Sequence, residues 1–153
     1  DSISFPESED EILAILEEMK EEQIPVTIQG AKTGITGAGV PMGGHILNLS
    51  HMNQVIEHSI EADGTGRITV EPGINLIELR KEITARFRKE QLFWPPDPTE
   101  TSASIGGIVA SGAQGISHML YGETENYIES IRLVDGSGNV RDISRGQKEE
   151  IQR

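Results

Sequence analysis

Glycines are concentrated in two stretches of this sequence, and that clustering restricts the possible folds more than any other feature. The chain has 17 glycines among its 153 residues, a share above the average of about 7%. They gather in residues 30–44 and 106–122 instead of spreading along the chain as turn residues. Segments with so little side-chain volume cannot form a core of their own. We therefore expect another group to lie close against their backbone.

The charge balance and the absence of cysteine exclude several classes of function. With 13 basic against 25 acidic residues and a net charge of −12, the chain is not expected to bind nucleic acid, which requires Lys and Arg to neutralise phosphates. A small anion remains compatible with this charge, because backbone N–H groups can hold it. Without cysteine there is no disulfide, no thiolate metal site and no cysteine nucleophile. We expect no metal site.

Hydropathy gives no sign of membrane insertion or secretion. No apolar run approaches the roughly 20 residues that span a bilayer, and the chain opens with acidic residues, unlike a signal peptide. We expect no transmembrane segment and a cytoplasmic location, with peripheral attachment to a membrane left open.

Local patterns predict alternating helices and strands. Ser8 and Glu11 form a capping box for a helix over residues 8–22, and Asn75 caps a second helix that extends to about Lys89. A tight turn and a short helix are expected within residues 102–115. Strands are predicted at 26–29, 45–49, 55–60, 68–70, 127–134 and 140–143, the last four forming two hairpins. The polar tail from Arg145 is expected to fray. This order of elements indicates an α+β fold.

The first chemically informative segment is Gln29–Pro41, with the sequence QGAKTGITGAGVP. A predicted strand leads into it, and glycines recur at positions 30, 34, 37 and 39. Such a loop can turn several N–H groups inward to form a nest for an anion, and Thr33 and Thr36 add hydroxyl donors. A flexible surface loop is the structural alternative.

Two common phosphate-binding motifs do not match this loop. A P-loop needs a glycine directly before Lys-Ser/Thr, whereas Ala31 precedes Lys32 here. The Rossmann fingerprint needs a third glycine three positions after the second, and Met42 stands there instead. The nest, if it forms, belongs to a different fold.

The second segment is Pro95–Gly115, which is rich in proline, serine and glycine. Ser102 and Ser104 offer hydroxyls, and the glycines at 106 and 107 let the backbone pass close to a flat or charged partner. The residues at 110–113 have small side chains, so little protrudes from the backbone there. We interpret the segment as a platform for a large ligand; a buried helix crossing is the alternative.

The order of the motifs resembles one family. A strand entering the Gly-rich loop is followed by Asn48-Leu49-Ser50, Val70-Glu71-Pro72-Gly73 before a helix, Pro95-Pro96-Asp97-Pro98, Ser102-x-Ser104-Ile105-Gly106-Gly107, Tyr121-Gly122, and a strand ending at Asp135-Gly136. This succession is similar to the FAD-linked oxidase family. Its flavin domain is shared by vanillyl-alcohol oxidase, p-cresol methylhydroxylase, D-lactate dehydrogenase and the glycolate oxidase flavin subunit. The likeness runs from about Ile3 to Ile143.

The resemblance implies a two-lobed α+β FAD-binding domain of the vanillyl-alcohol oxidase and p-cresol methylhydroxylase type. The first lobe would cover about 1–75 and the second about 76–153, incomplete and truncated before its last strands, with the substrate-binding cap absent. FAD would be bound non-covalently, since none of the four histidines lies in either key segment. The implied FAD contacts are Gln29, Gly30, Ala31, Lys32, Thr33, Gly34, Thr36, Gly37, Pro96, Asp97, Ser102, Ser104, Ile105, Gly106, Gly107, Ala110, Gly112, Gly115, Tyr121, Gly122 and Ile128.

The chain departs from the family pattern at several positions. Gln29 stands where the family often has Arg, and Lys32 occupies a position usually held by Gly or another small residue. Residues 111–114 read Ser-Gly-Ala-Gln where Thr-Asn-Ala-Gly is common, and Leu120 precedes Tyr121-Gly122 where Arg is frequent. Because of these changes, the resemblance defines the expected contacts at the adenine end less well than those of the Gly-rich loop.

By resemblance, the intact protein is expected to oxidise a 2-hydroxy acid such as D-lactate or glycolate by hydride transfer to FAD. The general base and the clamp for the substrate carboxylate would lie in the missing part, so no catalytic residue is assigned here. The fragment alone is expected to be inactive and to bind FAD weakly or not at all. Alternatives are a non-catalytic FAD- or nucleotide-binding module, an unrelated phosphate-binding domain, and a sugar-nucleotide reductase or ether-lipid synthase on the same fold.

Overall fold

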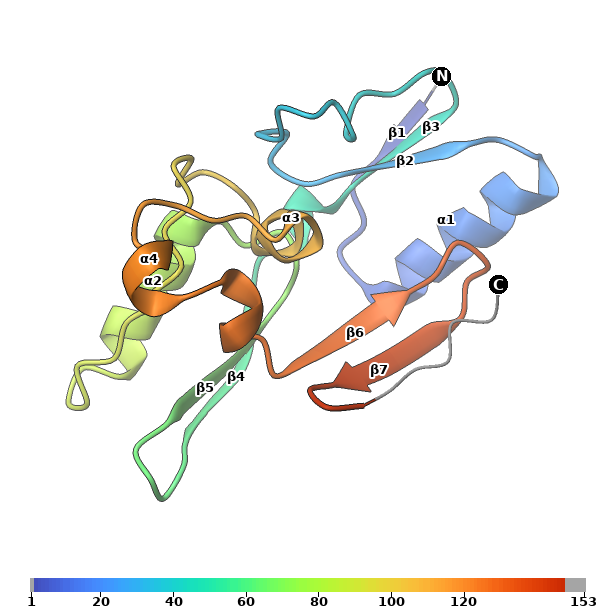
Figure 1. Cartoon of the computed structure of the whole chain (residues 1–153). Coiled ribbons are helices and arrows are strands. Elements are labelled where there is room, and N and C mark those ends of the chain that lie inside the picture. The colour runs from blue at the N-terminus through green and yellow to red at the C-terminus, as the bar shows by residue number, and fades with distance from the viewer. Residues whose placement is uncertain (1, 148–153) are drawn as a thin grey trace.

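A computed structural model describes residues 2–147. Its first unit is a parallel sheet of three strands in the order β1-β3-β2, formed by β1 (Ser2–Ser4), β2 (Val26–Gln29) and β3 (His45–Asn48). Helix α1 (Glu9–Glu21) connects β1 to β2 (Figure 1). Parallel neighbours need a long crossover, and between β2 and β3 the Gly-rich loop of residues 30–44 provides it in place of a helix. The loop therefore starts at the carboxyl end of β2, where ligands commonly bind in such sheets.

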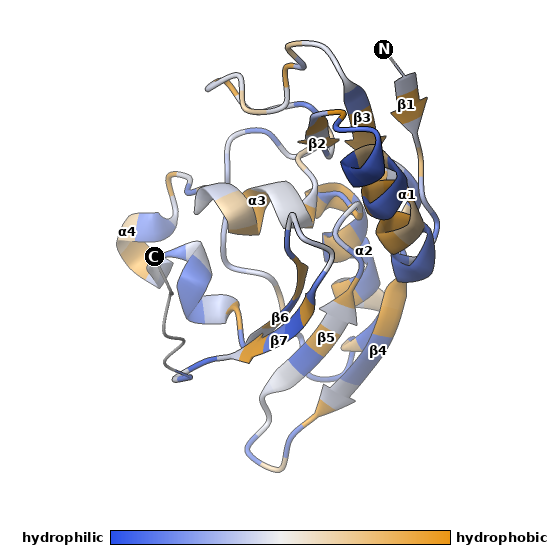
Figure 2. Ribbon diagram, turned by 90° about the vertical axis from the view of Figure 1, so that its right-hand side faces the viewer, coloured by the Kyte–Doolittle hydropathy of each residue, from blue (hydrophilic) through white to orange (hydrophobic). Residues whose placement is uncertain are grey.

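The predicted capping box at the start of α1 is present in modified form. The Ser8 hydroxyl accepts a hydrogen bond from the Glu11 amide, while the Glu11 carboxylate reaches back to the amide of Glu7 at 2.8 Å. The apolar side of α1 joins β3 in a small core that contains Ile12, Leu47 and Met52. The remainder of α1 is largely hydrophilic (Figure 2).

The second core is larger and lies around two further helices. The antiparallel hairpin β4 (Val55–Ile60) and β5 (Gly66–Val70) packs on α2 (Leu76–Arg86) and α3 (Ile105–Ser111). Asn75 caps α2 as predicted, its side chain accepting from the Glu78 amide at 2.9 Å. The buried residues of this core are Ile74, Leu76, Leu79, Ile83, Phe87, Ala103, Ile105 and Ile108.

The last described part of the chain carries short turns and a second hairpin. After α4 (His118–Tyr121) and the 3-10 turn η2 (Thr124–Tyr127), strands β6 (Ser130–Val134) and β7 (Val140–Ser144) pair antiparallel. β6 leads toward α1 (Figure 1), and Val134 packs against the core of α1 and β3.

Most predicted elements are confirmed, with several corrections. The three-residue strand β1 was not predicted. Residue 49 belongs to the 3-10 turn η1 (Leu49–His51) rather than to β3, α2 ends at Arg86, and residues 127–129 precede the strand that was predicted to include them. The tail predicted to fray falls partly outside the described residues, since only 145–147 of it are described. The division into lobes at about residue 75 stays a prediction. Within residues 2–147, no helix has the length and apolarity required to cross a membrane.

Candidate functional site

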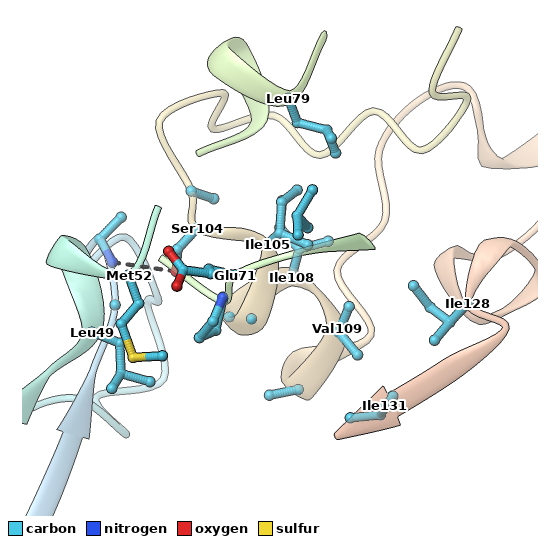
Figure 3. A pocket seen from close by; sticks show the side chains of 18 of the residues that line it. Leu49, Met52, Glu71, Leu79, Ser104, Ile105, Ile108, Val109, Ile128 and Ile131 are labelled. Atoms are coloured by element: carbon cyan, nitrogen blue, oxygen red, sulfur yellow. Dashed lines mark hydrogen bonds between the residues drawn. The ribbon is translucent and has the colours of Figure 1, made fainter. Parts of the chain in front are cut away.

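Residues from both glycine-rich stretches line one wide cleft of about 2180 Å³. The Gly-rich loop lines one part and α3 another, with β5 and β6 completing the walls. In the close-up, Leu49 and Met52 lie to one side of α3, and Ile128 and Ile131 lie to the other (Figure 3). The cleft exceeds the roughly 300–1,000 Å³ of ordinary small-molecule pockets. Its size suits an extended ligand together with further covering protein.

The Gly-rich loop has the backbone features of an anion nest. Lys32 (φ 62°) and Gly37 (φ 78°) adopt left-handed conformations, which turn successive amides to one side of a chain. None of the amides of residues 32–39 donates to an acceptor among residues 2–147. At Gly34 and Gly37 an added Cβ would meet nothing within 4 Å, so the space beside the loop is open to a ligand.

Gln29 closes the base of this loop with its side chain. Its Nε2 donates to the Gly39 carbonyl at 2.7 Å, and its Oε1 accepts from Asn48 Nδ2 at 3.3 Å. The side chain is only 8% exposed. The two polar termini of Gln29 are thus engaged in holding the ends of the loop together, a role that the sequence did not indicate.

Ser104 joins the two segments that were predicted to bind one ligand. Its Oγ accepts from the Ala31 amide at 3.4 Å. A Cβ at Gly30 would come within 2.1 Å of the same oxygen, so the close approach requires glycine there. On the other side, the Gly106 amide donates to the Pro72 carbonyl at 2.8 Å. Gly30 therefore permits a close contact with the Ser104 side chain, and Gly106 permits a close contact with Pro72.

The bend at Pro96 and Asp97 is anchored away from the cleft. Arg80 of α2 donates to Asp97 Oδ1 at 2.8 Å and to the Pro96 carbonyl at 3.2 Å. The hydrogen bond from Arg80 lowers the pKa of the Asp97 carboxyl, with a smaller contribution from Ser117. Gly115 pairs with Pro98 in an isolated bridge. These contacts fix the approach to α3.

The predicted contacts divide into two groups by position. Those lining the cleft are Gln29, Gly30, Ala31, Lys32, Thr33, Gly34, Thr36, Ser104, Ile105, Gly106, Gly107, Ala110 and Ile128. Those outside its lining are Gly37, Pro96, Asp97, Ser102, Gly112, Gly115, Tyr121 and Gly122. Ser102 instead lines a neighbouring polar groove of about 440 Å³ together with Ala31.

Two arginines of the cleft, Arg67 and Arg132, were not predicted as site residues from the sequence. Arg67 of β5 contacts Glu61 at 2.7 Å and Glu129 at 2.6 Å. Arg132 of β6 contacts Glu9 of α1 at 2.6 Å and Asp142 of β7 at 2.8 Å. Glu129 and Glu9 are far in sequence from the arginines that they contact, so no local pattern pairs them. Glu61 and Asp142 belong to the same hairpins as their arginines. No cluster of residues suited to a metal ion occurs within residues 2–147.

The α+β fold and this cleft are suited to an extended, phosphate-bearing cofactor. The family model described as "FAD binding domain" matches residues 1–144. The chain belongs to this family of FAD-linked oxidoreductases, and FAD is its cofactor. The loop fits the diphosphate of that cofactor, because its amides have no acceptor in the described part of the chain and Gly34 and Gly37 leave open space beside them.

Similar proteins include hydroxy-acid dehydrogenases and oxidases. The chain is 32% identical to D-lactate dehydrogenase of Anaerostipes hadrus over 134 residues, covering 87% of this chain and 27% of that protein. It is 30% identical to glycolate oxidase subunit GlcD of Bacillus subtilis (strain 168) over 142 residues, covering 92% and 29%. The chain thus spans under a third of these relatives.

Solved structures confirm the fold. An alkyldihydroxyacetonephosphate synthase superposes with a TM-score of 0.76 at 22% identity, over 95% of this chain and 26% of that one. A glucose dehydrogenase, Phl p 4, gives a TM-score of 0.76 at 19% identity, over 92% and 28%. The two proteins carry the names of different enzymes. Their likeness to this chain therefore establishes its fold and gives no information about its reaction.

Proposed function

We propose that this chain forms the diphosphate-binding part of an FAD enzyme that oxidises a small 2-hydroxy acid, such as D-lactate or glycolate, with FAD held non-covalently. The observation that carries the proposal is the open loop of residues 32–39. Its amides find no acceptor within residues 2–147, and it shares a cleft with Ser104 and α3. The names of the similar dehydrogenases and oxidases support the choice of substrate class.

When bound, FAD supplies the capacity to accept a hydride from the carbon that bears the substrate hydroxyl. The described residues are proposed to bind FAD and to orient it. The loop binds phosphate oxygens. Gly107 and Ala110 of α3 have small or no side chains, so the cofactor can lie close to the helix, and Ile128 and Ile131 exclude water on the opposite wall. Of the predicted contacts outside the cleft lining, Gly37 is proposed to shape the backbone of the loop. The others are proposed to act indirectly, by shaping the approach to the cleft.

The catalytic base is proposed to lie beyond the described residues. Glu9 and Glu100 line the cleft, and hydrogen bonds lower the pKa of both carboxyls: those from Arg132 at Glu9 and those from Ser102 at Glu100. A carboxylate with a lowered pKa is a poor general base at neutral pH. The same observation favours the second candidate, an FAD-binding module without chemistry of its own.

The full-length protein tests both candidates. We expect a flavin absorption spectrum, release of FAD on heating without covalent remnant, and reduction of a dye acceptor by D-lactate or glycolate. Flavin without turnover of either acid would favour the non-catalytic module, and absence of flavin would contradict the proposal.

Glycine substitutions test the loop itself. Gly34→Val and Gly37→Val in the full-length protein are expected to abolish flavin content, because the branched side chain fills the open space and Gly37 has a left-handed backbone. Gly136→Val, in the exposed turn between β6 and β7, is the matched control. Unchanged flavin in both loop variants would count against the nest.

The 153-residue chain alone is proposed to bind FAD weakly or not at all. Affinity requires that most of a ligand be buried, and this cleft is wide and open. Titration of the chain with FAD checks this; sub-micromolar binding would show that the described walls suffice.

A further inference from the structure

Lys32 adopts a backbone conformation that its side chain disfavours. Its φ of 62° is one of three positive values at non-glycine residues among residues 2–147; the others are Gln23 and Gln91. Gln23 follows the end of α1, where its amide bonds to the Lys20 carbonyl, and the Gln91 amide bonds to the Phe87 carbonyl. Lys32 follows no helix. A non-glycine residue in a left-handed conformation is strained, so the presence of a lysine here requires an explanation.

The charges around the cleft single out the same residue. Seven carboxylates line the cleft, against three Lys and Arg side chains: Lys32, Arg67 and Arg132. Both arginines form ion pairs with carboxylates at 2.6–2.8 Å. Within the part of the chain that the structure describes, Lys32 has no such partner, and its side chain is exposed. It is the cation of the cleft that remains available to an anion.

The rest of the loop supplies shape but no charge. Gln29, at the strand end, is neutral, and its carboxamide is engaged by Gly39 and Asn48. The amides of residues 32–39 can surround phosphate oxygens. In a chain of net charge −12, however, a dianionic diphosphate would approach a cleft dominated by negative charge.

We infer that the Lys32 ammonium binds the diphosphate of the cofactor. The loop is then a site with two parts, in which the backbone amides surround the phosphate oxygens and Lys32 provides the countercharge. The inference rests on the proposed function, because it requires the loop to face the diphosphate. Lys32 is then a determinant of ligand class. It favours a diphosphate-bearing nucleotide over the same flavin without phosphate.

The test uses full-length protein freed of flavin, with FAD, ADP and riboflavin as probes at several salt concentrations. Lys32→Gly and Lys32→Asn remove the charge in residues that tolerate the left-handed backbone, and Lys32→Arg retains it. The first two are expected to weaken FAD and ADP binding by about 10-fold or more, with a smaller salt dependence. Lys32→Arg should stay within about threefold of the wild type. Riboflavin binding should not change, and Lys32→Gly should raise the Tm of the flavin-free protein.

Lys20→Gln is the matched control, because it removes one positive charge on α1, outside the cleft lining. Wild-type FAD affinity in Lys32→Gly would overturn the inference. So would an equal loss in Lys20→Gln or a parallel loss of riboflavin binding, since these outcomes point to net charge or loop distortion. A wild-type protein that binds neither FAD nor ADP would instead contradict the proposed function itself.

Discussion

Gly115 shows how one residue can determine the route of the chain into the site. A Cβ at this position would lie 1.3 Å from the Asp97 carbonyl oxygen, and the pairing with Pro98 leaves the backbone no room to move. Gly115→Ala is therefore expected to lower the free energy of unfolding by at least about 2 kcal/mol. Gly136→Ala, which meets nothing within 4 Å, should have little effect. Urea denaturation of both variants checks this, and equal midpoints would contradict the packing argument.

The Asp97 carboxyl makes stability depend on pH in a defined direction. The hydrogen bond from Arg80 lowers its pKa below the ordinary value of about 3.9. A lowered carboxyl pKa contributes stability above the unfolded value, and this contribution is lost as pH falls through the folded value. Asp97→Asn should thus be less stable than the wild type at pH 7, and the difference should shrink below about pH 3.9. Thermal unfolding across pH 2.5–7 measures it; a constant difference would refute the role.

At the scale of single elements, the sequence predicted what local signals define. Ser8 and Asn75 are caps whose bonds form within a few residues, so the starts of α1 and α2 could be placed. Strand β1 has three residues and no periodicity, and it exists because β3 pairs with it. The turn at residues 124–127 is likewise set by a tertiary contact, since the buried Thr124 hydroxyl donates to the Ala113 carbonyl at 2.6 Å.

The candidate site divides in the same way between local and tertiary signals. The glycine spacing predicted the loop of residues 30–39, and the fold places it beside residues 103–111 in one cleft. The role of Gln29 could not be predicted, because Asn48 lies 19 residues away in sequence. The Arg67 and Arg132 ion pairs also join distant elements, and only the folded chain brings them together.

The β6–β7 hairpin is held to two other elements by charged contacts. Arg132 binds Glu9 of α1, and Glu129, just before β6, binds Arg67 of β5. Arg132→Gln should increase amide hydrogen exchange in β6 and β7 by no more than about fivefold, as expected for exposed ion pairs, without affecting α2. High salt should reduce the difference between variant and wild type. Arg88→Gln, at an exposed position after α2, is the control, and an equal change there would contradict the assignment.

At the scale of the whole molecule, two apolar cores border one wide cleft. One core joins α1 to β3, and the other joins α2, α3 and the β4–β5 hairpin. Residues from both cores reach the cleft, including Leu47 and Met52 from one and Leu79 and Ile108 from the other. A ligand that fills this space contacts both cores at once, so binding energy can couple units that pack separately.

This arrangement predicts two levels of stability in the flavin-free full-length protein. The larger core has eight buried residues against three in the smaller, so amides of β3 and α1 should exchange faster than those of α2. At 100 times its Kd, FAD stabilises the binding-competent state by about 2.7 kcal/mol. Because that state requires both walls of the cleft, protection should rise in both cores together. Hydrogen exchange with and without FAD measures this. A rise in protection confined to one core would mean that the cofactor contacts only one wall of the cleft. The loop and α3 would then not bind the same cofactor molecule.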